Sequence, residues 1–365
     1  MNDLLADTLA QLRTLVAFDT RNPPRTIGAP LFDHLQAQLR GFDLTRTDHG
    51  AGAISLLAVR GRPRLLFNVH LDTVPDSPGW SANPFELRVD GERAVGLGAC
   101  DIKGAAAALL AVVARTTGDC ALLFTTDEEA NDARCIRAYL QTGRPCDAVI
   151  VAEPTGAEAV LAHRGIHSVR VRFEGQAGHA SAQQAPKASA VHQAVRWAAG
   201  ALALAEAEAH QRFGGLTGLR LNIGRIEGGI KANMIAPEAE LRFGFRPLPS
   251  MDGDELLGRL CGLCDPAAAT FEETFRGPPL PAGDTAIAEI RRLAARDLAD
   301  ELGLPIGNAV DFWTEAALFS AAGQSALVYG PGDIAQAHAA DEWVTLEQLQ
   351  VYAESILRIV DAGQC

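Results

Sequence analysis

Residues 101–126 read DIKGAAAALLAVVARTTGDCALLFTT. The first part, which opens at Asp101, has a helix pattern, and the run CALLFTT from Cys120 to Thr126 is short, continuous and mainly apolar. An unbroken apolar run between turn residues is typical of a strand that is buried on both faces of a parallel sheet. Helices that alternate with such strands indicate an α/β fold. We therefore expect a doubly wound, mostly parallel sheet.

The same alternation extends outward in both directions. One strand ends at His70 in AVRGRPRLLFNVH, another ends near Glu153 in CDAVIVAEP, and a third lies in SALVYGPGD before the closing helix TLEQLQVYAESILRIVDAG. Strand ends of this kind are where open α/β sheets bind ligands.

The pattern changes at about Gly165. IHSVRVRFEG alternates apolar and polar residues, as a strand with one solvent-exposed face does. A long helix from Lys187 to about Gln211 follows, and the full order is strand, helix, strand, strand, helix, strand. This order predicts a ferredoxin-like α+β domain. We expect it to occupy residues 166–276 as an insertion into a main domain of residues 1–165 and 277–365.

Composition and charge exclude several classes of protein. The chain has 365 residues, 48% hydrophobic and 21% charged, with a net charge of −13, which repels nucleic acid and anionic lipid. The longest apolar stretch, from Gly104 to Ala114, is too short to span a bilayer, and the start has no signal-peptide pattern. We expect a cytoplasmic protein that binds neither nucleic acid nor membrane.

The seven cysteines have no spacing typical of a disulfide framework. Cys261 and Cys264 form a CxxC within a helix pattern whose apolar face includes both. A lone CxxC has no second pair with which to build a zinc site, so core packing is the preferred interpretation.

Polar groups with possible chemistry follow the expected strands. His70 and Asp72 in NVHLDTVP are two residues apart, so they share a face. A metal-bound imidazole commonly donates its free N–H to such a carboxylate, although for HxD alone a purely structural pair is the more common explanation. Asp101 lies in the Gly-rich turn GLGACDIKG, which fits neither the phosphate-loop nor the dinucleotide fingerprint. A helix cap is the alternative for Asp101.

Two adjacent acidic residues follow the expected strand that ends near Thr126. Glu128 and Glu129 in TTDEEA point in divergent directions, so one can ligate a cation while the other acts as a base; the alternative is a solvated acidic loop. Glu153 and His338 complete a set of imidazoles and carboxylates suited to zinc or a similar cation. A carboxylate such as Asp101 can bridge two ions.

The ordered motifs HLDTVP, GLGACDIKG, TTDEEA, AEPT, GQAGHAS and GPGDIAQAHAADEW run through nearly the whole chain. This order resembles the di-zinc aminoacylase and carboxypeptidase family, which includes acetylornithine deacetylase and succinyl-diaminopimelate desuccinylase. The resemblance implies two Zn²⁺ per subunit, with Co²⁺ or Mn²⁺ as substitutes, and a cis peptide after Asp101. It implies these roles: Asp101 as the bridging ligand, His70 and Glu153 on one ion, Glu129 and His338 on the other, Asp72 orienting His70, and Glu128 as general base.

The resemblance also assigns residues to the substrate. His179 in GQAGHAS corresponds to the residue that stabilises the oxyanion in the partner subunit's site, which implies a homodimer formed through the inserted domain. By itself, such a loop histidine is more often merely exposed. The other positions are Asn233, Arg246 for the α-carboxylate, Glu315, and the backbone of Gly330 and Gly332. Their ordinary alternatives are an ion pair for Arg246, a helix cap for Glu315 and a turn for the glycines.

RPLP, residues 246–249, and TEA, residues 314–316, are similar to the arginine-pathway deacetylases of the family. The expected reaction is therefore removal of an acetyl group from the α-nitrogen of a small N-acyl amino acid, with N-acetyl-L-citrulline preferred and acetate released. N-acetylornithine is the alternative substrate, and a desuccinylase or peptidase would share the same ligands. A binding protein without catalysis is disfavoured because all five ligand positions and Glu128 are filled.

Overall fold

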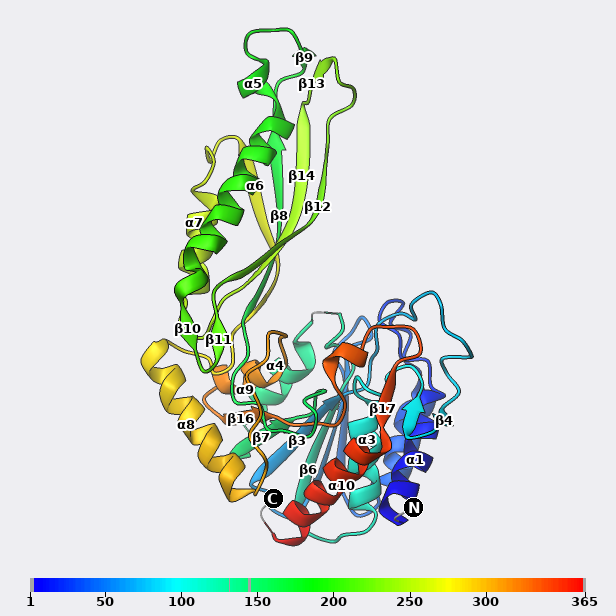
Figure 1. Cartoon of the computed structure of the whole chain (residues 1–365). Helices are drawn as coiled ribbons and strands as arrows, with labels where there is room; N and C mark the ends of the chain where they lie inside the picture. The colour runs from blue at the N-terminus through cyan, green and yellow to red at the C-terminus, as the bar shows by residue number, and fades with distance from the viewer. Residues whose placement is uncertain (1–2, 131, 144–145, 364–365) are drawn as a thin grey trace. The chain divides into compact units, whose positions relative to one another are not determined.

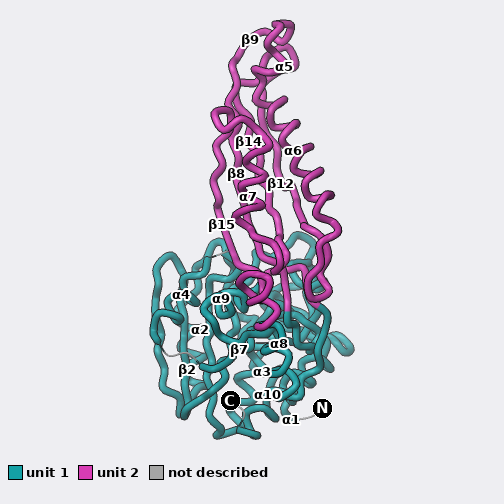
Figure 2. The backbone as a smooth tube through the Cα atoms, turned by 90° about the vertical axis from the view of Figure 1, so that its left-hand side faces the viewer, with its two compact units in different colours: residues 1–161, 291–308, 314–365 teal, residues 162–290, 309–313 magenta. Residues whose placement is uncertain are grey.

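The computed structural model describes residues 3–130, 132–143 and 146–363, so Cys365 lies outside the described residues. The chain divides into two compact units (Figure 2). Unit 1 comprises Met1–Leu161, Arg291–Asn308 and Thr314–Cys365, and unit 2 comprises Ala162–Ile290 and Ala309–Trp313.

Unit 1 is built on a six-stranded sheet with the order β1-β2-β6-β3-β7-β16. Its strands are β1 (Asp43–Asp48), β2 (Ile54–Arg60), β6 (Cys120–Thr125), β3 (Leu65–His70), β7 (Ala148–Val151) and β16 (Ser325–Val328). The last four of these run parallel to one another, and β2 is antiparallel to both of its neighbours. The strands β6, β3 and β7 are buried along their whole length, as their continuous apolar runs predict. The expected mostly parallel sheet is confirmed.

Helices cover this sheet on both faces (Figure 1). On one face, α3 (Lys103–Val113) packs against α1 (Asp3–Val16) and α10 (Leu346–Asp361). Every residue of α3 is buried, because its alanines and glycine let neighbouring elements approach closely on all sides. On the other face, α4 (Arg134–Gln141) packs against α9 (Ala316–Ala321). Unit 1 also contains α2 (Ala29–Gln38) and a three-stranded sheet of β17 (Trp343–Thr345), β5 (Arg93–Val95) and β4 (Arg88–Asp90).

Unit 2 contains an antiparallel four-stranded sheet with the order β12-β14-β8-β15. Its elements in chain order are β8 (Ile166–Glu174), α6 (Ala190–Ala207), β12 (Arg220–Gly228), β14 (Glu238–Arg246), α7 (Gly253–Cys261) and β15 (Ala269–Gly277). The alternation along β8 buries Val169, Val171 and Phe173 against the helices, around Trp197 of α6. The predicted ferredoxin-like topology is confirmed.

Three local predictions need correction. The long helix from Lys187 is interrupted, because Ser189 is extended and separates α5 (Ala185–Ala188) from α6. Helix α3 begins at Lys103 rather than at Asp101, and α7 ends at Cys261, so Cys264 lies beyond it and packs against the unit 2 core. In the described part of the chain, no helix combines the length and apolarity that crossing a membrane requires.

Candidate active site

The candidate metal ligands of unit 1 lie where its parallel strands end. His70 is the last residue of β3, Glu129 follows the end of β6 at Thr125, and Glu153 follows the end of β7 at Val151. These three strands are adjacent in the sheet, so their carboxyl ends meet at one edge. This is the edge at which open α/β sheets place their ligand sites.

His70, Asp101 and Glu153 form the first cluster. The Nε2 atom of His70 lies 3.2 Å from Oδ1 of Asp101 and 3.8 Å from Oε1 of Glu153, and all three side chains are buried. One ligand atom from each residue lies within 4.8 Å of the others. A single cation can therefore contact all three after small adjustments.

Asp101, Glu129 and His338 form the second cluster. The Nε2 atom of His338 lies 3.2 Å from Oδ2 of Asp101 and 3.1 Å from Oε1 of Glu129. The two oxygens of Asp101 therefore face two different histidines, which is the arrangement that a bridging carboxylate requires. The cap alternative for Asp101 is not seen, because Ile102 is the N-cap residue of α3. The Asp101–Ile102 peptide is cis, as the resemblance implied.

Asp72 lies behind His70. The Nδ1 atom of His70 is 3.0 Å from the backbone carbonyl oxygen of Asp72 and 3.5 Å from its Oδ1 atom. A proton held on Nδ1 by these acceptors leaves the lone pair of Nε2 directed at the first cluster. The Oδ2 atom of Asp72 accepts hydrogen bonds from Nδ2 of Asn22 at 2.9 Å and from the N–H of Glu129 at 3.0 Å.

The electrostatics of these clusters favour a cation. Burial raises the pKa of Glu153 to about 7, and hydrogen bonds to Asp101 and Glu129 raise the pKa of His338 to about 10. Burial, reinforced by the neighbouring Glu129 and other acids, raises the pKa of Glu128 well above its ordinary value. Buried carboxylates at this density are costly without a compensating positive charge. Imidazole nitrogens and carboxylate oxygens are also the donors that zinc and similar ions accept, so the residues fit such an ion.

Glu128 and Glu129 have different surroundings. Among the described residues, only Glu129 of this pair belongs to a cluster of possible ligands. Glu128 is half-buried beside it. The two neighbouring acids therefore differ in whether they face the candidate ligands.

The residues selected in unit 2 fall at two separate places. His179 belongs to β9 (Gly178–His179), which pairs with β13 (Met234–Ile235), and the carbonyl of Asn233 accepts a hydrogen bond from the N–H of Ala180 at 3.1 Å. We call residues 178–180 and 233–235 the β9–β13 end of unit 2. Arg246 ends β14, whereas the β9–β13 end adjoins the start of that strand at Glu238. Eight steps of about 3.4 Å make β14 about 27 Å long, so one copy of unit 2 keeps Arg246 far from His179.

Glu315 and the two loop glycines make contacts within unit 1 that the sequence did not predict. Glu315 is buried, and its Oε2 atom accepts a hydrogen bond from the hydroxyl of Thr125 at 3.2 Å instead of capping α9. The N–H of Gly330 donates to the hydroxyl of Thr155 at 3.1 Å, so it has a partner within the protein. A Cβ at Gly330 would lie 2.4 Å from the carbonyl oxygen of Glu153. Gly330 therefore lies against the backbone of a candidate ligand with no room for a side chain, while Gly332 adopts a φ of +92° beside Cys100.

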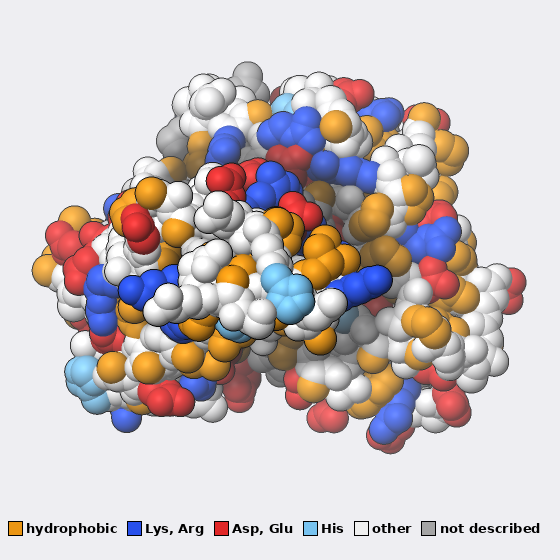
Figure 3. All heavy atoms as spheres, turned by 90° about the horizontal axis from the view of Figure 1, so that it is seen from above, with side chains coloured by type: hydrophobic (Ala, Val, Ile, Leu, Met, Phe, Trp, Pro, Cys, Tyr) orange, Lys and Arg blue, Asp and Glu red, His pale blue; other side chains and the backbone are white. Residues whose placement is uncertain are grey.

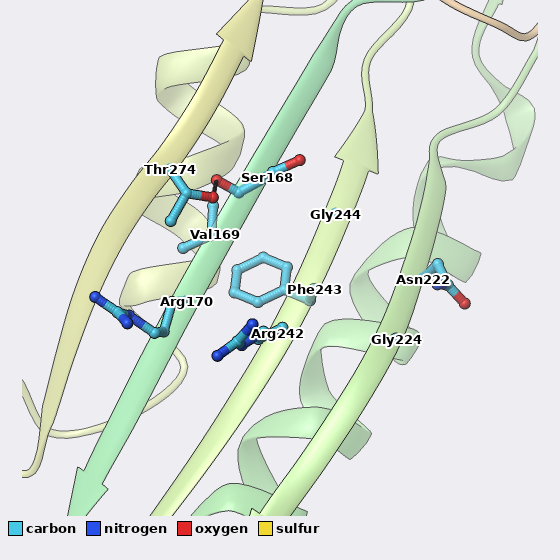
Figure 4. A pocket seen from close by; sticks show the side chains of 9 residues that line it. All are labelled: Ser168, Val169, Arg170, Asn222, Gly224, Arg242, Phe243, Gly244 and Thr274. Atoms are coloured by element: carbon cyan, nitrogen blue, oxygen red, sulfur yellow. Dashed lines mark hydrogen bonds between the residues drawn. The ribbon is translucent and has the colours of Figure 1, made fainter. Parts of the chain in front are cut away.

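Unit 2 carries a separate hollow of about 400 Å³ on its sheet (Figure 4). Arg170 of β8 and Arg242 of β14 line it, and both guanidinium groups are paired with glutamates, Glu272 and Glu240 respectively. The described residues that line this hollow include none of those selected from the sequence.

Two residues that contact the candidate site residues were not selected from the sequence. Asn22 donates to Asp72, and Glu342 accepts a hydrogen bond from the N–H of Asp101 at 2.9 Å. Glu342 lies within the quoted motif that contains His338, but its contact with Asp101 depends on chain pairing that no local pattern reveals.

Comparison with known proteins agrees with this geometry. The sequence model that describes peptidase family M20/M25/M40 matches residues 66–362 of this chain. The chain belongs to this family. The family resemblance inferred from the motifs is therefore confirmed.

Individual relatives refine the comparison. The chain is 69% identical over 365 residues to N-acetyl-L-citrulline deacetylase of Xanthomonas campestris pv. campestris, with all of both chains covered. It is 30% identical to acetylornithine deacetylase of Salmonella typhimurium, over 87% of this chain and 82% of that protein. Aminopeptidase PepT of Bacillus cereus shares the fold with a TM-score of 0.75 at 18% identity, over 99% of each chain.

Proposed function

We propose that the protein is a zinc-dependent amidohydrolase that removes the α-acetyl group of N-acetyl-L-citrulline and releases acetate. The observation that carries the substrate is the 69% identity, over the full length of both chains, to a protein named for this reaction. The two clusters around Asp101 support the metal-dependent chemistry, because the possible ligand atoms of each cluster lie within 4.8 Å of one another.

His70, Glu153 and Asp101 would hold one ion, and Asp101, Glu129 and His338 the other. When bound, such ions would lower the pKa of a water molecule and polarise the acyl carbonyl of the substrate. Asp72 keeps the Nδ1 proton on His70, so that Nε2 stays available.

Glu128 supplies the proton transfer. Its carboxylate accepts the proton of the attacking water and returns it to the departing α-amine, which restores Glu128 for the next turnover. His179 donates to the negative oxygen that develops on the acyl carbon, and Arg246 holds the α-carboxylate through paired N–H groups. Asn233, Glu315 and the loop of Gly330 and Gly332 complete the substrate side of the proposed site.

This division of roles requires two copies of the chain. His179 and Arg246 lie at opposite ends of β14, so both can serve one small substrate only if they come from different subunits. We therefore propose a homodimer formed through unit 2. The edge strand β12 is exposed along most of its length, and Ile226 of β12 and Val195 and Leu202 of α6 are exposed.

The face seen from above Figure 1 shows hydrophobic side chains gathered next to basic and histidine side chains (Figure 3). Exposed hydrophobic residues of unit 2 near the β9–β13 end include Ile230 and Met234. An open sheet edge with apolar neighbours is readily covered by a second copy.

The citrulline assignment is tested by comparing two acetylated substrates. Acetylcitrulline has a neutral ureido tail and acetylornithine has an ammonium tail, so kcat/KM for the purified, zinc-loaded protein separates them. We expect acetylcitrulline to be the better substrate. An equal or reversed preference would transfer the assignment to acetylornithine, for which the relative at 30% identity is the supporting observation.

Dipeptides and succinylated amino acids are the second set of substrates to assay. Hydrolysis of these compounds would use the same metal ligands. The compounds would differ only in how the pocket accepts the acyl group. Hydrolysis of dipeptides without hydrolysis of acetyl amino acids would support a peptidase instead of a deacetylase.

A further inference from the structure

Glu342 is a buried acid whose carboxylate is held by backbone N–H groups. Its side chain is 2% exposed. The Oε1 atom accepts hydrogen bonds from the N–H groups of Cys100 and Asp101, and Oε2 accepts one from the N–H of Gly98, each at 2.9 Å. Three N–H donors compensate a buried carboxylate and also fix its orientation.

The same residue attaches two distant parts of the chain. Its backbone carbonyl accepts a hydrogen bond from the N–H of Gly96 at 3.0 Å, and the next residue, Trp343, pairs with Val95 across β17 and β5. Glu342 therefore contacts residues 96–101 through both its backbone and its side chain. It lies four residues after His338.

These contacts bear directly on Asp101. The N–H that donates to Glu342 belongs to Asp101 itself, so the bond fixes the peptide plane from which the Asp101 side chain departs. That side chain must offer one oxygen to His70 and the other to His338. A small rotation of the backbone at Asp101 would improve one contact and lose the other.

We propose that Glu342 is a positioning residue that sets the distance between Asp101 and His338, and thereby the affinity for the ion held by Asp101, Glu129 and His338. The inference rests on the proposed metal-dependent function. His338 is the ligand most in need of such support, because its side chain is 52% exposed, whereas that of His70 is 2% exposed.

The test uses Glu342→Gln in the full chain, with Asp341→Asn as the matched control. Glutamine keeps the volume but has a single acceptor, so its NH₂ group must face an N–H and at least one of the three hydrogen bonds is lost. Asp341 is the adjacent acid, and its Oδ1 atom lies 2.6 Å from Nη2 of Arg88 in a surface ion pair. Its change removes the same charge without touching the Asp101 loop.

Zinc titration against a competing chelator measures the two affinities separately. We expect Glu342→Gln to bind one ion as the unaltered protein does and the other about 10–100-fold more weakly. Excess zinc should then restore part of the lost kcat, which a general loss of folding would not allow. Asp341→Asn should bind both ions as the unaltered protein does.

Equal binding of both ions by Glu342→Gln, or equal weakening in Asp341→Asn, would overturn the proposal. If Glu342→Gln fails to fold, Glu342→Asp replaces it, because aspartate keeps the charge but withdraws the carboxylate by one methylene. That variant should also bind one ion weakly, and binding of both ions at full affinity would refute the role. An unaltered protein that binds two ions without deacetylating would refute the proposed function alone, and one that binds none would refute both.

Discussion

In unit 1, three of the five candidate ligands lie at or just after the ends of buried strands, whereas in unit 2, His179 and Asn233 are exposed beside a pair of two-residue strands. The candidate ligands and the residues beside them make several hydrogen bonds and ion pairs. Asp101 faces two histidines, Asp72 accepts from Asn22 and from the N–H of Glu129, and Glu342 accepts from three N–H groups. At His179, the ring faces its near neighbour Ser181, with 2.7 Å between Nδ1 and Oγ.

This difference separates two requirements of the proposed reaction. Ligands that hold a metal must come within about 0.5 Å of the geometry that the ion requires, and one chain of unit 1 brings them together. A residue that stabilises charge on the substrate need only be in place during turnover. The β9–β13 end can therefore remain exposed until a second subunit is present.

The largest expected effect distinguishes the adjacent acids of unit 1. Glu128→Gln should lower kcat by about 10²–10⁴-fold with two zinc ions still bound, because the variant loses the base but keeps every ligand. Glu129→Gln is the matched control, and it should lose one ion because a neutral amide is a weaker ligand. Elemental analysis and kcat check both. Equal loss of zinc in the two variants would mean that their roles are misassigned.

The next effect tests whether unit 2 acts across subunits. His179→Ala should lower kcat by about 10²–10³-fold, the cost of removing one oxyanion donor, without loss of zinc. Co-expression of this variant with Glu128→Gln should restore about a quarter of the activity of the unaltered protein if subunits assort at random, because each mixed dimer has one intact site.

His192→Ala is the control for this experiment. His192 is another histidine of unit 2, on the first turn of α6. Its change should leave kcat unaffected. If the verified mixed dimer of His179→Ala and Glu128→Gln recovers no activity, the proposal that His179 acts in the partner subunit's site is wrong.

The same contrast explains what the sequence could predict. His70, Glu128, Glu129 and Glu153 follow apolar runs that are readable without any structure, and a parallel sheet brings the ends of such runs to one edge. The assignment of His338 and Asp101 to that edge came from the family motifs. The sheet and its inserted unit followed from local periodicity alone.

Contacts between distant segments were not predictable in this way. Glu342 and Asp101 are 241 residues apart, and their contact depends on how β17 pairs with β5. The break at Ser189 has a similar origin, since the N–H of Ala190 donates to the carbonyl of Ala236 at 3.0 Å. The engaged N–H of Gly330 depends on Thr155. In each case a tertiary hydrogen bond overrides what the local residues favour.

A smaller effect is expected at Asn22. Asn22→Ala removes a donor to Asp72, so that the carboxylate behind His70 loses one of its restraints. Zinc affinity should fall by about 10-fold. Asn83→Ala is the control, because Asn83 donates to Glu86 at 2.9 Å on the surface of the same unit. Unchanged zinc affinity in Asn22→Ala would show that Asp72 is fixed sufficiently by the N–H of Glu129.

The smallest expected effect on the metal site comes from the core of unit 2. Trp197 is fully enclosed between the sheet and the helices, its Nε1 donates to the carbonyl of Leu260 at 2.8 Å, and its ring lies 4.6 Å from that of Phe243. Trp197→Phe loses this hydrogen bond and part of the packing, which should lower the free energy of unfolding by about 1–3 kcal/mol. Denaturant titration measures the loss.

Zinc affinity in Trp197→Phe should equal that of the unaltered protein, because all candidate ligands belong to unit 1. Any fall in activity should therefore track the stability of unit 2 and disappear at lower temperature, where the variant is fully folded. A loss of zinc in the folded variant would contradict the separation between the two regions. It would mean that the ligand geometry of unit 1 depends on the packing of unit 2, which the contacts around Asp101, Asp72 and Glu342 give no reason to expect.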